Sequence, residues 1–132
     1  MKPAQLLALT FLLGLIATGH SQNDAIDFDK ARQLMERVGS DNLFVQMDLY
    51  HCQVMRGDLA EEIKTHLPLV GHIQIAGNPG RHEPDIGEIN YPYLFDLLDD
   101  LGYTGWVGCE YRPRGSTVAG LGWGRAYGLG VA

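Results

Sequence analysis

Apolar residues recur along the chain in segments whose spacing switches between two types. In residues 27–42 they fall three and four positions apart, which predicts a helix that stops at Gly39. Residues 58–69 show the same spacing, and Asp58, three residues before Glu61, resembles a capping box at the helix start. A third helix is predicted over residues 91–101, with Asn90 as its cap.

Short apolar runs lie between these helices and predict strands. They cover residues 43–50, 71–76 and 105–111, and they lack clean alternation, as in strands covered on both faces. The order helix–strand–helix–strand–helix–strand requires crossover connections, and these favour a parallel sheet. The sequence therefore predicts an α/β fold with three parallel strands, followed by a Gly-rich tail.

The first 22 residues differ in kind from the rest. Lys2 precedes an apolar run from Leu6 to Ala17, and a small-x-small site follows at residues 17–19. This layout is typical of a secretory signal peptide, and the run is too short for a comfortable membrane span. A buried hydrophobic helix or a leader created by an alternative start would give the same pattern.

Charge and cysteine content narrow the choice of function. The net charge is −6 and the ten Lys and Arg residues are scattered along 132 residues, which argues against a nucleic-acid surface. A small anionic substrate would need a local basic group or a metal ion. Cys52 and Cys109 are expected to be free thiols, because two isolated cysteines form no disulfide framework.

Polar residues end each predicted strand, and parallel strands direct their carboxyl ends the same way. The residues concerned are Asp48 and His51, then Gln74, then Glu110, with Arg81 in the loop after the second strand. Carboxylate and amide oxygens suit Mg²⁺ or Mn²⁺. Arg81 offers a planar cation for a carboxylate or hydroxyl pair.

Each of these residues has a structural alternative that the sequence leaves open. Asp48 could cap a turn, and His51 and Gln74 could bond neighbouring backbone. Glu110 could belong to a surface ion pair, and Arg81 could be a solvated loop cation.

Three segments resemble the hydroxypyruvate isomerase family of xylose-isomerase-like (β/α)₈ TIM barrels. They are "QMDLYHCQVMRGDL", "GHIQIAGNPGRHEPDIGEINYPYLF" and "GWVGCEYRPRGSTVAGL". The resemblance covers roughly residues 26–123 and implies a partial TIM barrel, with three βα units in the places of the sixth to eighth strands. A complete barrel takes about 250 residues. The implied division is a leader at 1–22, a barrel part at 26–123 and a tail at 124–132.

The resemblance also implies a reaction and roles for site residues. The family interconverts hydroxypyruvate and 2-hydroxy-3-oxopropanoate through an enediol. Glu110 matches a proton donor and acceptor, and Asp48, Gln74 and Glu110 match positions that hold a divalent metal, Mg²⁺ or Mn²⁺. His51 and Arg81 match positions that contact substrate oxygens. A sugar epimerase of the same superfamily is one alternative, although Gln74 favours the hydroxypyruvate branch.

Two departures and one absence qualify this expectation. Gly77 replaces an Asp common in relatives, and Ile86 changes the following loop. The family's second essential Glu belongs to a preceding strand that has no counterpart here, so an incomplete active site is expected in this chain alone. A non-catalytic secreted or partner-binding barrel remnant is then a further alternative, and the sequence leaves homo-oligomer formation open. The family is expected in the cytoplasm, whereas the leader would direct the chain to secretion.

Overall fold

The chain folds around one parallel sheet of three strands. The structure, a computed structural model, describes residues 28–128. The strands lie in the order β1 (Val45–Asp48), β2 (Val70–Ile75) and β3 (Trp106–Cys109). The helical elements are α1 (Phe28–Val38), α2 (Leu49–Met55), α3 (Leu59–His66), η1 (Leu67–Leu69), α4 (Tyr91–Asp100), α5 (Thr117–Gly120) and η2 (Leu121–Tyr127).

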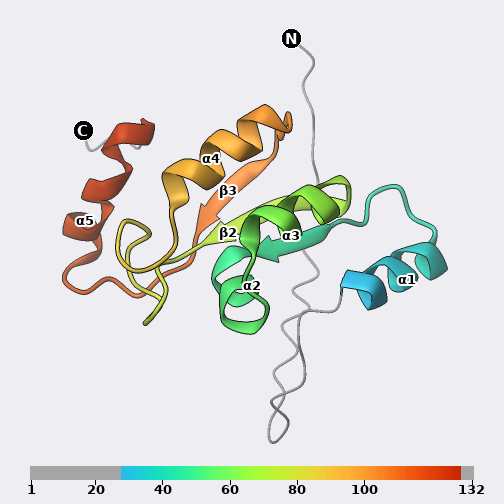
Figure 1. Cartoon of the computed structure of the whole chain (residues 1–132), viewed down its shortest axis with the longest axis horizontal. Helices are drawn as coiled ribbons and strands as arrows, with labels where there is room; N and C mark the ends of the chain where they lie inside the picture. Colours follow the sequence, from blue (N-terminus) through green and yellow to red (C-terminus); the bar gives the residue numbers. More distant parts are fainter. Residues whose placement is uncertain (1–27, 129–132) are drawn as a thin grey trace, which may run out of the picture.

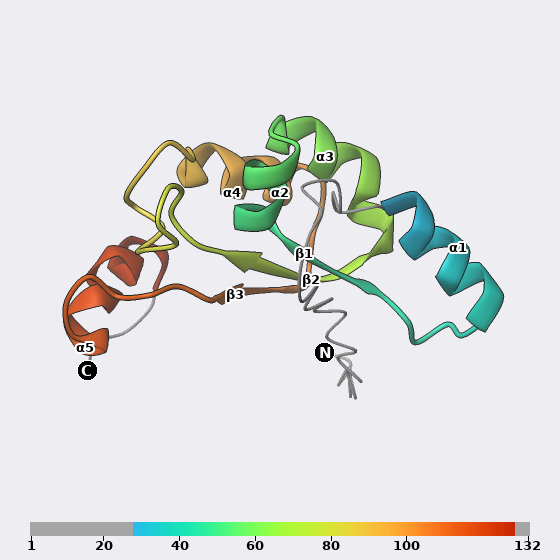
Figure 2. The ribbon, with the colours of Figure 1, turned by 90° about the horizontal axis from the view of Figure 1, so that it is seen from below.

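Helices α2, α3 and α4 cover one face of the sheet (Figures 1 and 2). Alternation along the strands directs Met47, Ile73 and Ile75 to that face, where they are buried. The hydrophobic core forms between the sheet and these helices. Its members are Phe28, Met47, Leu49, Cys52, Leu59, Ile63, Val70, Ile73, Ile75, Tyr91, Leu94 and Leu98.

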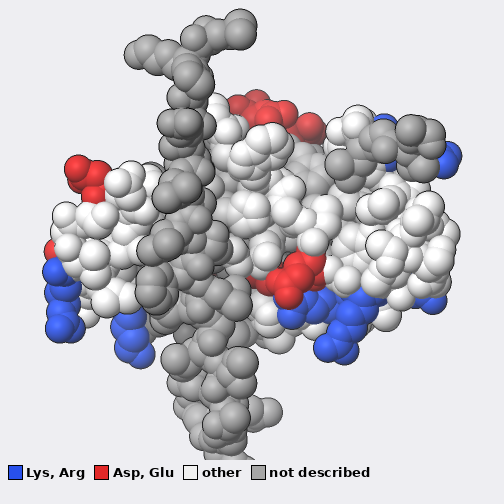
Figure 3. All heavy atoms as spheres, turned by 180° about the vertical axis from the view of Figure 1, so that it is seen from behind, with Lys and Arg blue, Asp and Glu red and all other residues white. Residues whose placement is uncertain are grey.

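The opposite face of the sheet, called the open face below, carries polar side chains of β1 and β2. Gln46 and Asp48 of β1 alternate with buried Met47, and Gln74 of β2 alternates with buried Ile73 and Ile75. Figure 3 shows this side of the molecule, where acidic and basic side chains adjoin. The fold therefore places its polar strand residues away from its helices.

The predicted α/β order and parallel sheet are confirmed, and so are the helix cap at Asn90 and the free thiols. Two features differ from the sequence-based expectation. Asp58 makes no capping bond, because its backbone is left-handed at φ 49°. The segment after β1 forms helix α2, which the sequence did not predict because its residues show no apolar periodicity.

The outer parts of the sheet and of α1 remain exposed. Leu34 and Val38, which gave α1 its helical spacing, are 42% and 55% exposed, and Trp106 on β3 is 78% exposed. The spacing thus predicted the helix correctly, but only Phe28 of its apolar stripe is buried, and Leu34 and Val38 stay exposed. This arrangement is that of a partial barrel, in which neighbouring units would cover such surfaces.

The predicted leader lies outside the described residues, as do the last four residues of the predicted tail. Between residues 28 and 128, none of the helices has the length and hydropathy needed to cross a membrane. The division of the chain at residues 22 and 124 stays a prediction.

Candidate active site

Four of the predicted site residues meet where the strands end on the carboxyl side. Arg81 Nη2 lies 3.2 Å from Asp48 Oδ2 and 2.8 Å from Glu110 Oε2. Arg81 Nη1 lies 3.1 Å from His51 Nε2. One guanidinium group therefore joins the carboxylate of Asp48 and the imidazole of His51, which lie three residues apart, to the distant carboxylate of Glu110.

The two oxygens of Asp48 serve different neighbours. Oδ1 caps helix α2 by accepting hydrogen bonds from the backbone N–H groups of Tyr50, at 2.9 Å, and His51, at 3.3 Å. Oδ2 faces Arg81 and lies 3.7 Å from His51 Nε2. Burial raises the pKa of this carboxyl group, opposed by the charges of His51 and Arg81 and by the two backbone hydrogen bonds. The capping alternative is thus correct and coexists with a place in the cluster.

Arg81 is held in a backbone conformation that few side chains adopt. Its φ is 57°, in the left-handed region. The loops after β2 and β3 fix it there, because Arg112 N donates to Arg81 O at 2.7 Å and His82 Nδ1 lies 2.8 Å from Arg112 O. Its guanidinium carbon also lies 5.3 Å from the centre of the Tyr50 ring.

Glu110 continues β3 by one residue, and its N–H donates to Ile75 O at 3.1 Å. Its side chain is 56% exposed, so the ion pair with Arg81 lies at the open side of the cluster. A carboxylate that is fixed at one end and accessible at the other has the placement that proton transfer to a small substrate requires.

Gln74 is in a different situation from the other four. It lies beside Asp48 in the register of β1 and β2, but its Oε1 accepts a hydrogen bond from Gln46 Nε2 at 2.8 Å. Gln46 is not among the residues predicted from the sequence, although its place two residues before Asp48 on the same strand would have indicated it. Tyr50 was not predicted either, because only the helical turn of α2 brings its ring beside the Arg81 guanidinium.

The predicted metal site remains a prediction. Within residues 28–128, no three His, Cys, Asp or Glu side chains gather closely enough to hold an ion. The cation between Asp48 and Glu110 is the Arg81 guanidinium. The donor chemistry nevertheless fits, because two carboxylates and the Gln74 amide oxygen are the hard ligands that Mg²⁺ and Mn²⁺ prefer.

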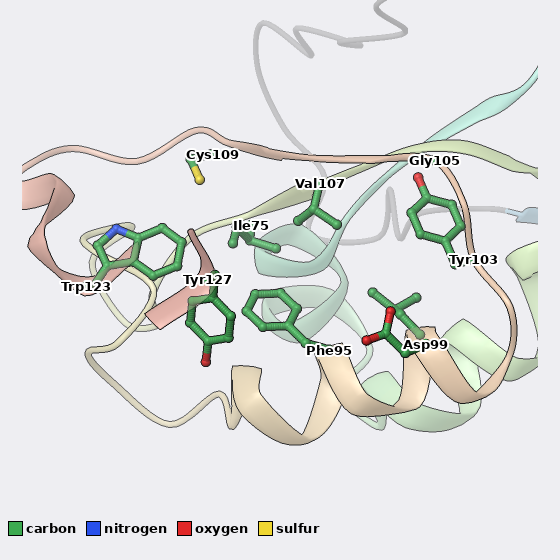
Figure 4. A pocket seen from close by; sticks show the side chains of 10 residues that line it. Ile75, Phe95, Asp99, Tyr103, Gly105, Val107, Cys109, Trp123 and Tyr127 are labelled. Atoms are coloured by element: carbon green, nitrogen blue, oxygen red, sulfur yellow. The ribbon is translucent and has the colours of Figure 1, made fainter. Parts of the chain in front are cut away.

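A separate cavity of about 290 Å³ lies on the helix-covered side of the sheet, between β3, α4 and η2 (Figure 4). Apolar and aromatic side chains such as Phe95, Trp123 and Tyr127 line it, and Asp99 is its one carboxylate. It contains no acid–base pair and none of the predicted site residues. The strand-end cluster is therefore the better candidate for chemistry.

Comparison with known proteins identifies the fold that carries this cluster. The sequence profile of the xylose isomerase-like TIM barrel family matches residues 10–127. The chain belongs to this family. Family membership accounts for the parallel strands and for the gathering of polar groups at their carboxyl ends, which is where TIM barrels carry their sites.

Curated family members with similar sequences have isomerase names. The 2-oxo-tetronate isomerase of Cupriavidus necator is 58% identical over 99 residues, which are 75% of this chain and 38% of that protein. A Xenopus laevis protein named "Putative hydroxypyruvate isomerase" is 58% identical over 98 residues, 74% of this chain and 36% of that protein. The chain thus spans little more than a third of the length of these relatives.

Two solved structures match this fold. A structure described as AP endonuclease, family 2, from Brucella melitensis matches with a TM-score of 0.70 and 54% identity. The match covers 74% of this chain and 38% of that one. The 3-keto-D-glucoside 4-epimerase of E. coli matches with a TM-score of 0.64 and 28% identity, over 74% of this chain and 39% of that one.

Proposed function

We propose that this chain carries one side of the active site of an isomerase for small hydroxy-oxo acids. The reaction interconverts hydroxypyruvate and 2-hydroxy-3-oxopropanoate. The observation that supports it is the convergence of Asp48, Glu110 and His51 on the Arg81 guanidinium at the strand ends. The isomerase names of similar proteins support the reaction class.

The reaction moves one proton between neighbouring carbons. A proton leaves C3 of hydroxypyruvate and a proton arrives at C2, while the hydroxyl proton passes from one oxygen to the other through an enediol. Glu110 serves as a proton acceptor and donor, since its carboxylate is accessible at the mouth of the cluster. Arg81 and His51 orient the substrate through its oxygens.

A divalent cation would complete the electrostatics of this site. Mg²⁺ or Mn²⁺ held by Asp48, Gln74 and Glu110 would supply Lewis-acid stabilisation of the charge on the enediol oxygens. Arg81 contributes a fixed positive charge beside the same oxygens, which offsets the negative charge of the protein as a whole.

The described residues offer one accessible carboxylate at the site, whereas complete isomerisation uses a carboxylate on each side of the reacting carbons. Proton exchange at a single carbon therefore is the activity expected of this chain by itself. Incubation of hydroxypyruvate or 2-hydroxy-3-oxopropanoate in D₂O, with Mg²⁺ or Mn²⁺, tests this by NMR. We expect deuterium incorporation above the protein-free background, with slow net isomerisation.

Two variants sharpen that experiment. Glu110→Gln should abolish the exchange, whereas Glu36→Gln, the same change at an exposed position on α1, should leave it unaltered. Exchange that persists in Glu110→Gln would overturn the role of Glu110. Fast net isomerisation by the unmodified chain would show that its site is complete.

Epimerisation of a keto sugar is a second candidate, favoured by the structural match to the E. coli epimerase. It uses the same removal of a proton beside a carbonyl. The same D₂O experiment with a 3-keto-glucoside distinguishes the two, because the preferred substrate exchanges faster at equal concentration.

We propose that the chain acts in the cytoplasm, as expected of an enzyme of small-molecule metabolism. The two unpaired thiols of Cys52 and Cys109 are compatible with a reducing compartment. The intact mass of the natural protein tests this, because a secreted form would have lost roughly the first 22 residues.

A further inference from the structure

The open face of the sheet carries a pair of glutamines that the proposed reaction does not by itself explain. Gln46 on β1 and Gln74 on β2 are both half-buried, and Gln46 Nε2 donates to Gln74 Oε1 at 2.8 Å. The two strands pair in parallel, with Asp48 beside Gln74 and Gln46 beside His72. The hydrogen bond therefore runs diagonally, from one row of side chains to the next.

Gln74 has few other neighbours that could hold its amide group. Its neighbour on β3 is Gly108, which has no side chain, and the His72 ring lies over that glycine, with Nε2 2.8 Å from where a Cβ would stand. Its neighbour on β1, Asp48, is engaged by the start of α2 and by Arg81. Among the described residues, Gln46 makes the side-chain hydrogen bond that the structure records for Gln74.

Orientation matters more for a glutamine than for a carboxylate. One end of the amide group accepts hydrogen bonds or binds a cation, and the other end only donates. The last side-chain torsion of glutamine is broad and two-fold, so an unsupported amide samples both orientations. A partner that donates to Oε1 selects one of them and removes the entropy cost of ordering the group when a ligand arrives.

We propose that Gln46 is a positioning residue that holds the Gln74 amide in the orientation the active site uses. This inference rests on the proposed function, since it assigns Gln74 to the ligand-binding row beside Asp48. Groups behind a ligand-binding side chain commonly contribute 10–100-fold in affinity or activity. Gln46 acts through Gln74 and itself contacts neither substrate nor metal.

A plain cross-strand pair would also join two glutamines, and it makes different predictions. Such a pair contributes to the stability of the sheet and has no effect on ligand binding. A positioning role predicts a large effect on ligand binding and a small effect on stability. Removal of the Gln46 amide should then leave the thermal midpoint almost unchanged, while the Gln74 amide loses its order and the ligand binds more weakly.

The test uses the full chain labelled with ¹⁵N, with the side-chain NH₂ signals of Gln74 as the readout. In Gln46→Leu we expect these signals to change from those of an ordered amide to those of a mobile one. Titration with hydroxypyruvate in the presence of Mg²⁺ should give a dissociation constant at least about 10-fold higher than that of the unmodified chain. Gln33→Leu, the same change at an exposed position of α1, is the matched control and should alter neither measurement.

Gln46→Glu tests the direction of the hydrogen bond. A carboxylate can only accept, so the Gln74 amide should turn end for end and become ordered again, with one NH₂ proton shifted by its new bond. Gln74 signals that remain unchanged in both Gln46 variants would overturn the inference. So would a mobile Gln74 amide in Gln46→Leu combined with unaltered hydroxypyruvate affinity.

The outcomes separate this inference from the proposed function. If the unmodified chain binds no hydroxypyruvate and exchanges no protons, the proposed function fails and the positioning role fails with it. If the chain binds and exchanges while Gln46→Leu behaves like Gln33→Leu, only the role of Gln46 fails.

Discussion

The Tyr91 hydroxyl forms two hydrogen bonds with the backbone of a single residue, Ala76. It accepts from Ala76 N at 3.1 Å and donates to Ala76 O at 2.8 Å. Ala76 directly follows β2, so this pairing ties the first turn of α4 to the strand end that leads into the Arg81 loop. Burial raises the pKa of Tyr91, which keeps the hydroxyl protonated and able to donate.

Tyr91→Phe should therefore destabilise the protein by about 1–3 kcal/mol, because buried backbone groups of Ala76 lose their partner. Urea unfolding followed by circular dichroism measures the change. Tyr93→Phe is the matched control, since Tyr93 is half exposed on the same helix, and it should alter the free energy of unfolding by less than about 0.5 kcal/mol. Equal effects of the two variants would contradict the importance of the Tyr91 hydroxyl.

Gly77 is expected to be essential to the loop that carries Arg81. A Cβ there would collide with the backbone carbonyl oxygens of Glu83 and Ile86, so the loop is closed only because residue 77 lacks a side chain. Gly77→Ala should cost about 1–3 kcal/mol through overpacking. The thermal midpoint is a suitable measurement.

Gly115→Ala provides the control for that substitution, because a Cβ at Gly115 would meet no atom within 4 Å. Its thermal midpoint should match that of the unmodified protein. A Gly77→Ala protein that is as stable as Gly115→Ala would mean that the loop opens without cost.

Substitution of Asp58 by glycine should increase the stability of the protein. Its φ of 49° and ψ of 46° place it in the left-handed region, and its side chain forms no capping bond in return. Asp58→Gly is expected to stabilise the protein by up to about 1 kcal/mol, as judged by chemical unfolding. Asp41→Gly, in an exposed turn without positive φ, should give no stabilisation.

His66 is expected to make stability depend on pH. Its ring is buried, stacks on Phe28 at 4.0 Å between centroids and lies 3.4 Å from Glu62 Oε2. Burial lowers the pKa of His66 below 6.5, although Glu62 opposes the shift. The unfolded chain therefore binds a proton at His66 more readily than the folded chain does. The contribution of neutral, buried His66 to the free energy of unfolding is present above about pH 6.5, and it is lost as the pH falls through the pKa that His66 has in the folded state.

Unfolding free energies measured from pH 8 to pH 5 test this expectation. The difference between the unmodified chain and His66→Gln should narrow as the pH falls, because glutamine does not titrate. A constant difference across that range would show that His66 takes up no proton on unfolding.

The sequence allowed much of this molecule to be predicted, and the limits have physical reasons. The three strands could be predicted because short apolar runs that are bounded by polar residues and separated by helices are typical of the buried strands of a parallel sheet. The meeting of Asp48, His51, Arg81 and Glu110 followed from the common direction of strand ends. The pairing of Gln46 with Gln74 did not, since it depends on a strand register that no local pattern encodes.

Helix α2 and the strain at Asp58 escaped prediction for another reason. Helix α2 begins at Leu49, directly after the last residue of β1, and has no apolar stripe, so only the capping bonds of Asp48 reveal it. Asp58 and Glu61 are residue types that suit a capping box, but the left-handed backbone conformation of Asp58 prevents the capping bond. In both cases the backbone angles at one residue decided the outcome.

The two roles of the Asp48 carboxylate restrict which residues could replace it. One oxygen caps helix α2 while the other lies 3.2 Å from Arg81 in the proposed site, so a replacement must preserve both the helix start and the contact with Arg81. Asparagine alone among the common alternatives keeps a capping oxygen of the same reach while it removes the charge. A substitution of Asp48 by any shorter or apolar side chain would therefore disturb the start of α2 together with the site.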